Sequence, residues 1–193
     1  MTWIGDAMSN YWQGHAILLR GIESRDTEHF VRWNRDSERG RNLDFLWPPV
    51  GQTQVAAWVE EQCHKRLHDD QFHWIIENRD GKAVGSIATH HCDHRNGTFG
   101  YAVDIDVEHR RLGHATEAIT MVLRYYFREL RYQKVTVAVH GDNHPSLCLH
   151  DKMGFVREGC HRRMMFTGGK YVDVFWFGMT DDEFGARFGG CAS

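Results

Sequence analysis

A strand-like run, a glycine-containing loop and a long helical pattern follow one another in mid-chain and constrain the fold most. Residues 98–105 have strand composition, residues 110–115 read Arg-Arg-Leu-Gly-His-Ala, and the helical pattern covers 116–130. The first N–H groups of a helix have no intrahelical acceptor and lie at the positive end of its dipole, so this position binds anions. Gly113 and Ala115 leave room for a ligand beside the backbone. The loop therefore predicts a site for a phosphate-bearing cofactor.

Two common nucleotide-binding loops are absent, because the chain has no G-x-x-x-x-G-K-[ST] and no G-x-G-x-x-G after a strand. What remains is R-x-x-G-x-A, a short pattern that many chains match by chance. Further motifs follow it in order. Asn-His-Pro-Ser stands at 143–146, His-Asp-Lys-Met-Gly-Phe-Val at 150–156, and Glu158-Gly159, Arg162-Arg163 and Gly-Lys-Tyr-Val-Asp (169–173) come after them.

Together these motifs resemble the GNAT superfamily of N-acetyltransferases, whose acetyl-CoA loop reads Q/R-x-x-G-x-G/A and precedes N-x-x-S and Y-E-K-x-G-F. The tail and the segment 19–36 are similar to the branch with the Rim-type ribosomal-protein N-terminal acetyltransferases and the spermidine acetyltransferases. The resemblance spans residues 17–184. It implies an enzyme that moves an acetyl group from acetyl-CoA to a primary amine in a ternary complex.

The order of predicted elements favours an α+β fold of mixed α/β layers. The resemblance implies a mostly antiparallel sheet of about seven strands with about four helices. We expect a single domain over 1–193, with its core at 16–184, and Ser24 as an N-cap. The predicted strands are 16–22, 72–77, 82–89, 98–105, 134–140, 155–164 and 170–179, and the predicted helices are 24–36, 53–68, 116–130 and 146–152.

Bulk properties exclude several classes of protein. The net charge of −3 disfavours a nucleic-acid partner, and no apolar run approaches the length of a membrane span. Residues 1–12 do not have the pattern of a signal peptide. Five cysteines without a C-x-x-C pair suggest reduced thiols, so we expect a cytoplasmic protein. The run 90–94 (His-His-Cys-Asp-His) lacks zinc spacing and falls at an expected hairpin turn. Adjacent side chains on a strand point to opposite faces, which would separate the neighbouring histidines, so we expect no metal.

The resemblance assigns residues to the cofactor. The pyrophosphate would lie on the backbone amides of 111–115 beside Arg110, while the backbone of the preceding strand would bind the pantetheine arm. Asn143 and Ser146 match positions that contact that arm. From the residues alone, Asn143 is equally a turn former and Ser146 a helix N-cap. The predicted cofactor residues are Ile105, Val107, Arg110, Arg111, Leu112, Gly113, His114, Ala115, Thr116, Asn143 and Ser146.

Catalysis needs a base for the amine and an acid for the departing thiolate. In many relatives a tyrosine acts as the general acid for the thiolate at the position where this chain has His150. His150 is either an imidazolium that donates this proton or a residue packed under the cofactor. Some relatives carry a glutamate base where this chain has Ala138. Asp104 and His140 are the available substitutes, each acting through water, or else are solvated polar groups at strand ends.

The resemblance places the acceptor between the first helices and the last strands. Phe45, Trp47 and Tyr171 are the predicted substrate-binding residues, with Leu46 and Trp58 nearby. Aromatic rings with acidic neighbours suit a cationic amine, such as a polyamine, a protein N-terminus, an aminoglycoside or an amino acid. A non-catalytic acyl-CoA sensor and an antibiotic-modifying acetyltransferase are the alternatives. Relatives that dimerise through late strands imply a homodimer.

Overall fold

The structure, a computed structural model, describes residues 10–65 and 69–189. Its strands form one 7-stranded sheet in the order β1-β2-β3-β4-β5-β7-β6. Only β4 and β5 pair in parallel, so the sheet is mostly antiparallel and the predicted α+β fold is confirmed. The strands are β1 (Ile17–Gly21), β2 (His73–Asn78), β3 (Ala83–Asp93), β4 (Thr98–Ile105), β5 (Lys134–His140), β6 (Val156–Thr167) and β7 (Lys170–Thr180).

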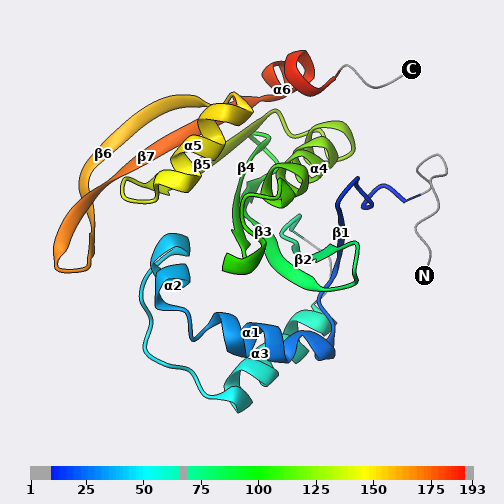
Figure 1. The fold of residues 1–193 in the computed structure, drawn as a ribbon. Helices are drawn as coiled ribbons and strands as arrows, with labels where there is room; N and C mark the ends of the chain where they lie inside the picture. The colour runs from blue at the N-terminus through cyan, green and yellow to red at the C-terminus, as the bar shows by residue number, and fades with distance from the viewer. Residues whose placement is uncertain (1–9, 66–68, 190–193) are drawn as a thin grey trace.

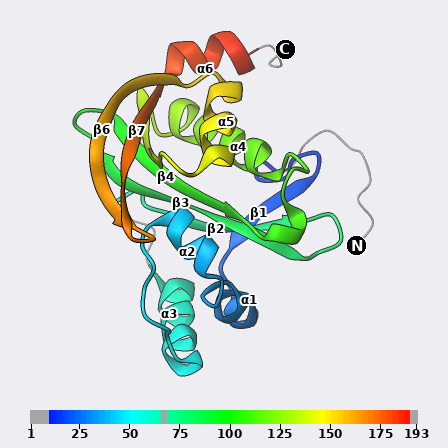
Figure 2. The same ribbon diagram turned by 60° about the vertical axis from the view of Figure 1, so that its left-hand side comes forward.

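Different helices cover the two faces of this sheet (Figure 1). The long helix α4 (His114–Arg128) and the shorter α5 (His144–Met153) lie on one face. Figure 2 shows α1 (Thr27–Trp33), α2 (Ser37–Leu43) and α3 (Gln52–His64) on the opposite face. We call these the cofactor face and the acceptor face. Helix α6 (Asp181–Phe188) follows β7 and packs against α4.

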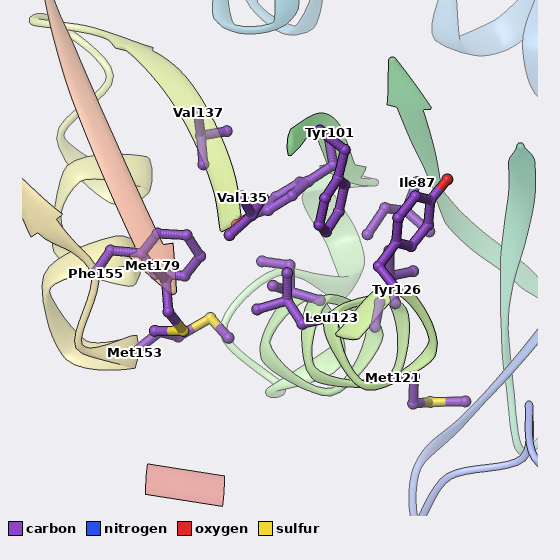
Figure 3. Close-up of a cluster of buried hydrophobic side chains, with 14 of the residues drawn as sticks. Ile87, Tyr101, Met121, Leu123, Tyr126, Val135, Val137, Met153, Phe155 and Met179 are labelled. Carbon is purple, nitrogen blue, oxygen red and sulfur yellow. The ribbon is translucent and has the colours of Figure 1, made fainter. Parts of the chain in front are cut away.

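The main core lies between α4, α5 and the cofactor face of the sheet. Residues of α4 at helical spacing, such as Ile119, Leu123 and Tyr126, are fully buried against strand residues. Figure 3 shows Tyr101 of β4 and Val135 of β5 among these side chains. A second cluster lies between the sheet and the helices of the acceptor face and contains Ile22, Phe30, Trp33, Val55, Val59, Ile75 and Ala83.

The helices differ from the sequence prediction in three places. Residues 37–52, expected to be irregular, contain α2, because the carboxylate of Asp36 caps the backbone N–H groups of Glu38 and Arg39. Helix α6 was also missed and begins with a capping box formed by Thr180 and Glu183. Ser24 is not an N-cap but lies in a 3-10 turn (Ser24–Asp26) capped by Glu23. The predicted helix end at His68 lies outside the described residues.

Strands β4 and β5 separate after a short paired segment. They pair at Thr98 with Lys134 and at Phe99 with Val135, and no further along. β4 stays paired with β3 up to Ile105, and the N–H of Asp106 donates to the carbonyl of Val84 at 2.8 Å. Because antiparallel bonding alternates, the backbone groups of residues 101, 103 and 105 face the gap toward β5. We call this gap the wedge, and it lies beside the strand backbone that the resemblance assigns to the pantetheine arm.

Candidate active site

The loop between β4 and α4 presents free backbone donors. It passes through a 3-10 turn (Val107–His109) and turns at Arg111 (φ 65°) and Gly113 (φ 85°) into α4. Within the described part of the chain, the N–H groups of residues 112–116 have no protein acceptor. A Cβ added at Gly113 would meet nothing within 4 Å, so a ligand can reach this backbone. The loop therefore has the form of an anion site at a helix N-terminus.

His114 lies inside this site. Its side chain is buried, and its Nδ1 has no hydrogen-bond partner in the described structure. Burial lowers the pKa of His114, helped by the neighbouring charge of His109, so the ring is neutral at pH 7. A buried polar nitrogen without a partner is costly unless a ligand supplies one. His114, the open amides and Gly113 therefore fit a bound diphosphate, while the neighbouring Leu112 and Thr116 are exposed and Ala115 is half-buried.

The two arginines of the loop have different environments. Arg110 donates from Nε to the carbonyl of Ile105 at 3.0 Å and lies 3.6 Å from a carboxylate oxygen of Glu38. Arg111 is exposed at the turn itself. Val107, which the resemblance matches to the pantetheine-binding strand, instead lies in the 3-10 turn with an exposed side chain, because β4 ends at Ile105. A cofactor arm at the carbonyl of Ile105 would meet Arg110 there.

The start of α5 brings the second pair of predicted cofactor residues to the wedge. Asn143 is the N-cap of α5: its Oδ1 accepts from the N–H of Ser146 at 3.2 Å, and its Nδ2 donates to the carbonyl of Asn42 at 3.3 Å. Ser146 is therefore not the cap. Its Oγ lies 3.4 Å from Nδ1 of His150, one helical turn further along.

His150 is enclosed rather than exposed to the wedge. Its side chain is 2% exposed, its Nδ1 lies 2.8 Å from the carbonyl of Ser146, and its Nε2 lies 2.9 Å from the hydroxyl of Tyr101. Burial lowers the pKa of His150, so the ring is neutral at pH 7. Of the two roles considered for His150, this environment favours packing over proton donation by an imidazolium.

Asp104, one predicted base, lies on the acceptor face and is already engaged. Its carboxylate forms a buried ion pair with Arg39 of α2, whose guanidinium stacks over Trp33 at 4.5 Å. Burial raises the pKa of Asp104, and Arg39 opposes that rise. The ion pair attaches α2 to β4. The carboxylate of Asp104 is buried, so it is not the solvated group at a strand end that was the alternative.

His140, the other predicted base, has a defined tautomer. Its Nδ1 lies 3.0 Å from the carbonyl of Arg41, which only accepts, so Nδ1 carries a proton and the lone pair of the neutral ring is on Nε2. The ring is only partly buried at the end of β5. A histidine with this arrangement can accept a proton at Nε2 without changing its other contact.

Helix α2 spans the wedge on the acceptor face. Arg39 binds Asp104 of β4, while the carbonyls of Arg41 and Asn42 accept from His140 and Asn143 on the β5–α5 side. We call these three contacts the α2 bridge. Sequence reasoning missed Arg39, because its partner lies 65 residues away and no local pattern joins them.

The predicted acceptor residues do not form one cluster. Phe45 and Trp47 are exposed after α2, with ring centroids 6.0 Å apart, and Trp47 donates to the carboxylate of Asp44 at 3.4 Å. Tyr171 lies beside the β6–β7 turn, where its ring packs against Phe166 and beneath the guanidinium of Arg163. A hollow that the sequence did not reveal lies between α1 and the end of β4. Its lining is Arg32, Trp33, Asp36, Asp106, Val107 and Glu108.

The histidine run at the end of β3 differs from its expected geometry. Residues 90–93 lie on β3 and His94 lies in the turn that follows, and a bulge with His91 at φ 51° brings Nδ1 of His91 to 2.9 Å from Nδ1 of His90. The two rings therefore meet instead of pointing to opposite faces. Among residues 10–65 and 69–189, no group of three or more His, Cys, Asp or Glu side chains is arranged to hold a metal ion. Cys63, Cys92, Cys148 and Cys160 are free thiols, and Cys191 lies outside the described residues.

Comparison with known proteins decides the family. The family described as "Acetyltransferase (GNAT) domain" matches residues 16–156. The chain belongs to the GNAT acetyltransferase family. This GNAT domain is 43% identical over 179 residues to the SPbeta prophage-derived uncharacterized N-acetyltransferase YokL of Bacillus subtilis (strain 168), covering 93% of this chain and 98% of the relative.

More distant relatives of the GNAT domain have known acceptors. The spermidine N(1)-acetyltransferase of Escherichia coli (strain K12) is 23% identical, over 81% of this chain and 82% of the relative. The spermidine N-acetyltransferase of Vibrio cholerae, solved with CoA and spermine, shares the fold with a TM-score of 0.76 at 19% identity, covering 87% of this chain and 97% of that one. The protein is an N-acetyltransferase of a family that uses acetyl-CoA, as predicted. No helix in the described ranges has the length and apolar character needed to cross a membrane.

Proposed function

We propose that this enzyme transfers the acetyl group of acetyl-CoA to a primary amine of a small, cationic, polyamine-like molecule, by direct transfer in a ternary complex. One observation carries the donor site: the open N–H groups of residues 112–116, beside a turn where Gly113 leaves the backbone uncovered. These donors would hold the diphosphate, and the exposed Arg111 adds charge.

The wedge would receive the pantetheine arm. Backbone groups of Val103 and Ile105 face it, and Asn143 and Ser146 lie where α5 begins beside it. Acetyl-CoA supplies an activated thioester, so the protein mainly aligns the amine and stabilises developing charge. The N–H groups along this edge of β4 are suited to an oxyanion.

His140 would remove the proton from the incoming ammonium, directly or through one water molecule. Its Nδ1–H is held by the carbonyl of Arg41, which leaves Nε2 as the acceptor. Asp104 would instead orient α2 through Arg39.

The acceptor class rests on charge and on the relatives. The hollow beside the end of β4 is lined by three carboxylates, one guanidinium and the ring of Trp33, a set that favours a cation. Exposed Phe45 and Trp47, with Asp44, extend this character beyond α2. Relatives that acetylate spermidine support the same choice.

Thiol release from acetyl-CoA tests the proposal. Spermidine, spermine, short peptides with free N-termini, aminoglycosides and amino acids are compared as acceptors. Release with polyamines above all others is expected. Release with peptides alone would contradict the acceptor class and support a protein N-terminus. Binding of acetyl-CoA without release in any arm would favour the non-catalytic sensor. Release with aminoglycosides, together with protection of cells, would favour antibiotic modification.

A further inference from the structure

A side-chain hydrogen bond joins the two sides of the wedge just beyond the point where backbone pairing stops. β4 and β5 last pair at Phe99 and Val135. The next residue of β4 on the cofactor face is Tyr101, whose hydroxyl lies 2.9 Å from Nε2 of His150 on α5. Because α5 follows β5 in the chain, this bond connects β4 to the β5–α5 side of the wedge where the backbone hydrogen bonds between the strands end.

The direction of the bond follows from the other ring nitrogen. Nδ1 of His150 lies 2.8 Å from the carbonyl of Ser146, which only accepts, so Nδ1 carries the proton. Nε2 therefore holds a lone pair and accepts the hydroxyl proton of Tyr101. Every polar atom of the pair is used in this arrangement, and no proton is left to donate toward the wedge.

The pair is locked in place by packing. Both side chains are 2% exposed, and their rings lie 6.0 Å apart and nearly parallel. Phe155 and Phe177 flank the imidazole at 5.0 and 5.4 Å. Burial raises the pKa of Tyr101 and lowers that of His150, so both are neutral near pH 7. Figure 3 shows Tyr101 within this core.

We propose that Tyr101 and His150 are a positioning pair that sets the separation of β4 and α5, and thereby the fit of the wedge to the pantetheine arm of acetyl-CoA. The inference rests on the proposed function. α5 carries Asn143 and Ser146, and β4 carries the backbone groups of Val103 and Ile105, so the pair aligns two sets of donor-binding groups at once. Neither residue touches the reacting atoms in this role.

A double-mutant cycle tests the pair. Tyr101→Phe removes the hydroxyl, His150→Met removes both ring nitrogens, and a third variant combines them. His150→Gln restores an acceptor near the position of Nε2. Acetyl-CoA affinity is measured by calorimetry, together with KM, kcat and the pH profile of kcat.

Each single variant is expected to raise the Kd and KM for acetyl-CoA about tenfold, and the double variant no more than either one, because both lose the same bond. His150→Gln should stay within about threefold of the wild type. The pH profile of kcat should keep its shape in every variant, since no titrating group has been removed from the reaction.

Tyr126→Phe is the matched control. The hydroxyl of Tyr126 is also buried, with the carbonyl of Asp70 and Oγ1 of Thr89 (at 2.6 Å) as its acceptors. Tyr126 lies on α4, and within the described structure none of its side-chain hydrogen bonds or ring contacts reaches α5. This variant should lose thermal stability to a degree similar to Tyr101→Phe while keeping its affinity for acetyl-CoA. Equal weakening of acetyl-CoA binding by both tyrosine variants would reduce the pair to ordinary core packing and overturn the proposal.

Two other results would also overturn the positioning pair. In the first, His150→Met loses kcat and one limb of its pH profile while Tyr101→Phe behaves as wild type, which would make His150 the general acid. In the second, the wild type binds acetyl-CoA and no variant changes that affinity. A wild-type protein that does not bind acetyl-CoA at all would refute the proposed function, and the inference with it.

Discussion

The cofactor face and the acceptor face of the sheet are built differently around the wedge. On the cofactor face, the anion site is made by consecutive residues of one loop, and the side chains beneath it form a continuous apolar core. On the acceptor face, α2 is held by polar contacts between segments far apart in the chain, including the Arg39–Asp104 pair. The proposed site for the diphosphate of acetyl-CoA is therefore built from residues that are consecutive in the sequence, whereas the proposed acceptor site depends on contacts between distant segments.

Breaking the buried ion pair of the acceptor face should have the largest effect. Asp104→Asn leaves the guanidinium of Arg39 buried without its counter-charge, so the free energy of unfolding should fall by about 3–5 kcal/mol. Urea denaturation measures it. Asp151→Asn, which breaks an ion pair with Arg157 at the surface, is the control and should cost far less. Equal losses of stability in the two variants would show that the Arg39–Asp104 pair stabilises the protein no more than a surface ion pair does, which would contradict its role in holding α2.

Removing the proposed base tests whether the acceptor face performs chemistry as well as binding. His140→Ala should lower kcat about a hundredfold or more, because the ammonium would lose its proton acceptor. Affinity for acetyl-CoA should change little. Steady-state kinetics with saturating donor give the answer, and His64→Ala on the exposed surface of α3 is the control. A kcat within twofold of the wild type would exclude His140 as the base.

A bulky residue in the loop tests the cofactor face. Gly113→Leu should weaken acetyl-CoA binding by about 30-fold, since the side chain would occupy the space in front of the open amides. Gly169→Leu is closely matched, because Gly169 also has a positive φ (78°) and open space around it but lies at the β6–β7 turn. Backbone strain should be similar in both, so calorimetry separates strain from ligand exclusion. Identical affinities would refute the loop assignment.

The last expected effect is a pH dependence of the folding stability within the acceptor face. Burial lowers the pKa of His73 to about 4, beside the rings of Phe30 and Trp58. Between pH 6.5 and 4 the unfolded chain binds a proton that the folded chain does not. Stability should therefore fall as the pH decreases, with this residue contributing about 2–3 kcal/mol across that window. Denaturation of His73→Phe at pH 7 and 4.5 should show a shallower decline than the wild type; an unchanged slope would contradict the assignment.

The sequence predicted what short patterns determine. The bounds of β4 and β5 agree with their predicted ranges, because alternating β-branched and aromatic residues end at clear turns. Helix α2 was missed, because its seven residues carry mixed charges and a glycine, and because Arg39 is held by Asp104, which lies 65 residues away in the chain. The enclosure of His150 was equally invisible, since its partner Tyr101 lies 49 residues away.

The α2 bridge has a consequence for how the two substrates affect each other. One helix is bonded to β4 through Arg39 and to the β5–α5 side through the carbonyls of Arg41 and Asn42. Acetyl-CoA bound in the wedge that shifts either β4 or the β5–α5 side would therefore also move α2, which lies next to the acceptor hollow. An amine that moves α2 would in turn shift these two sides of the wedge. Thermodynamic linkage then requires reciprocity: whatever factor acetyl-CoA applies to the affinity for the amine, the amine applies to the affinity for acetyl-CoA.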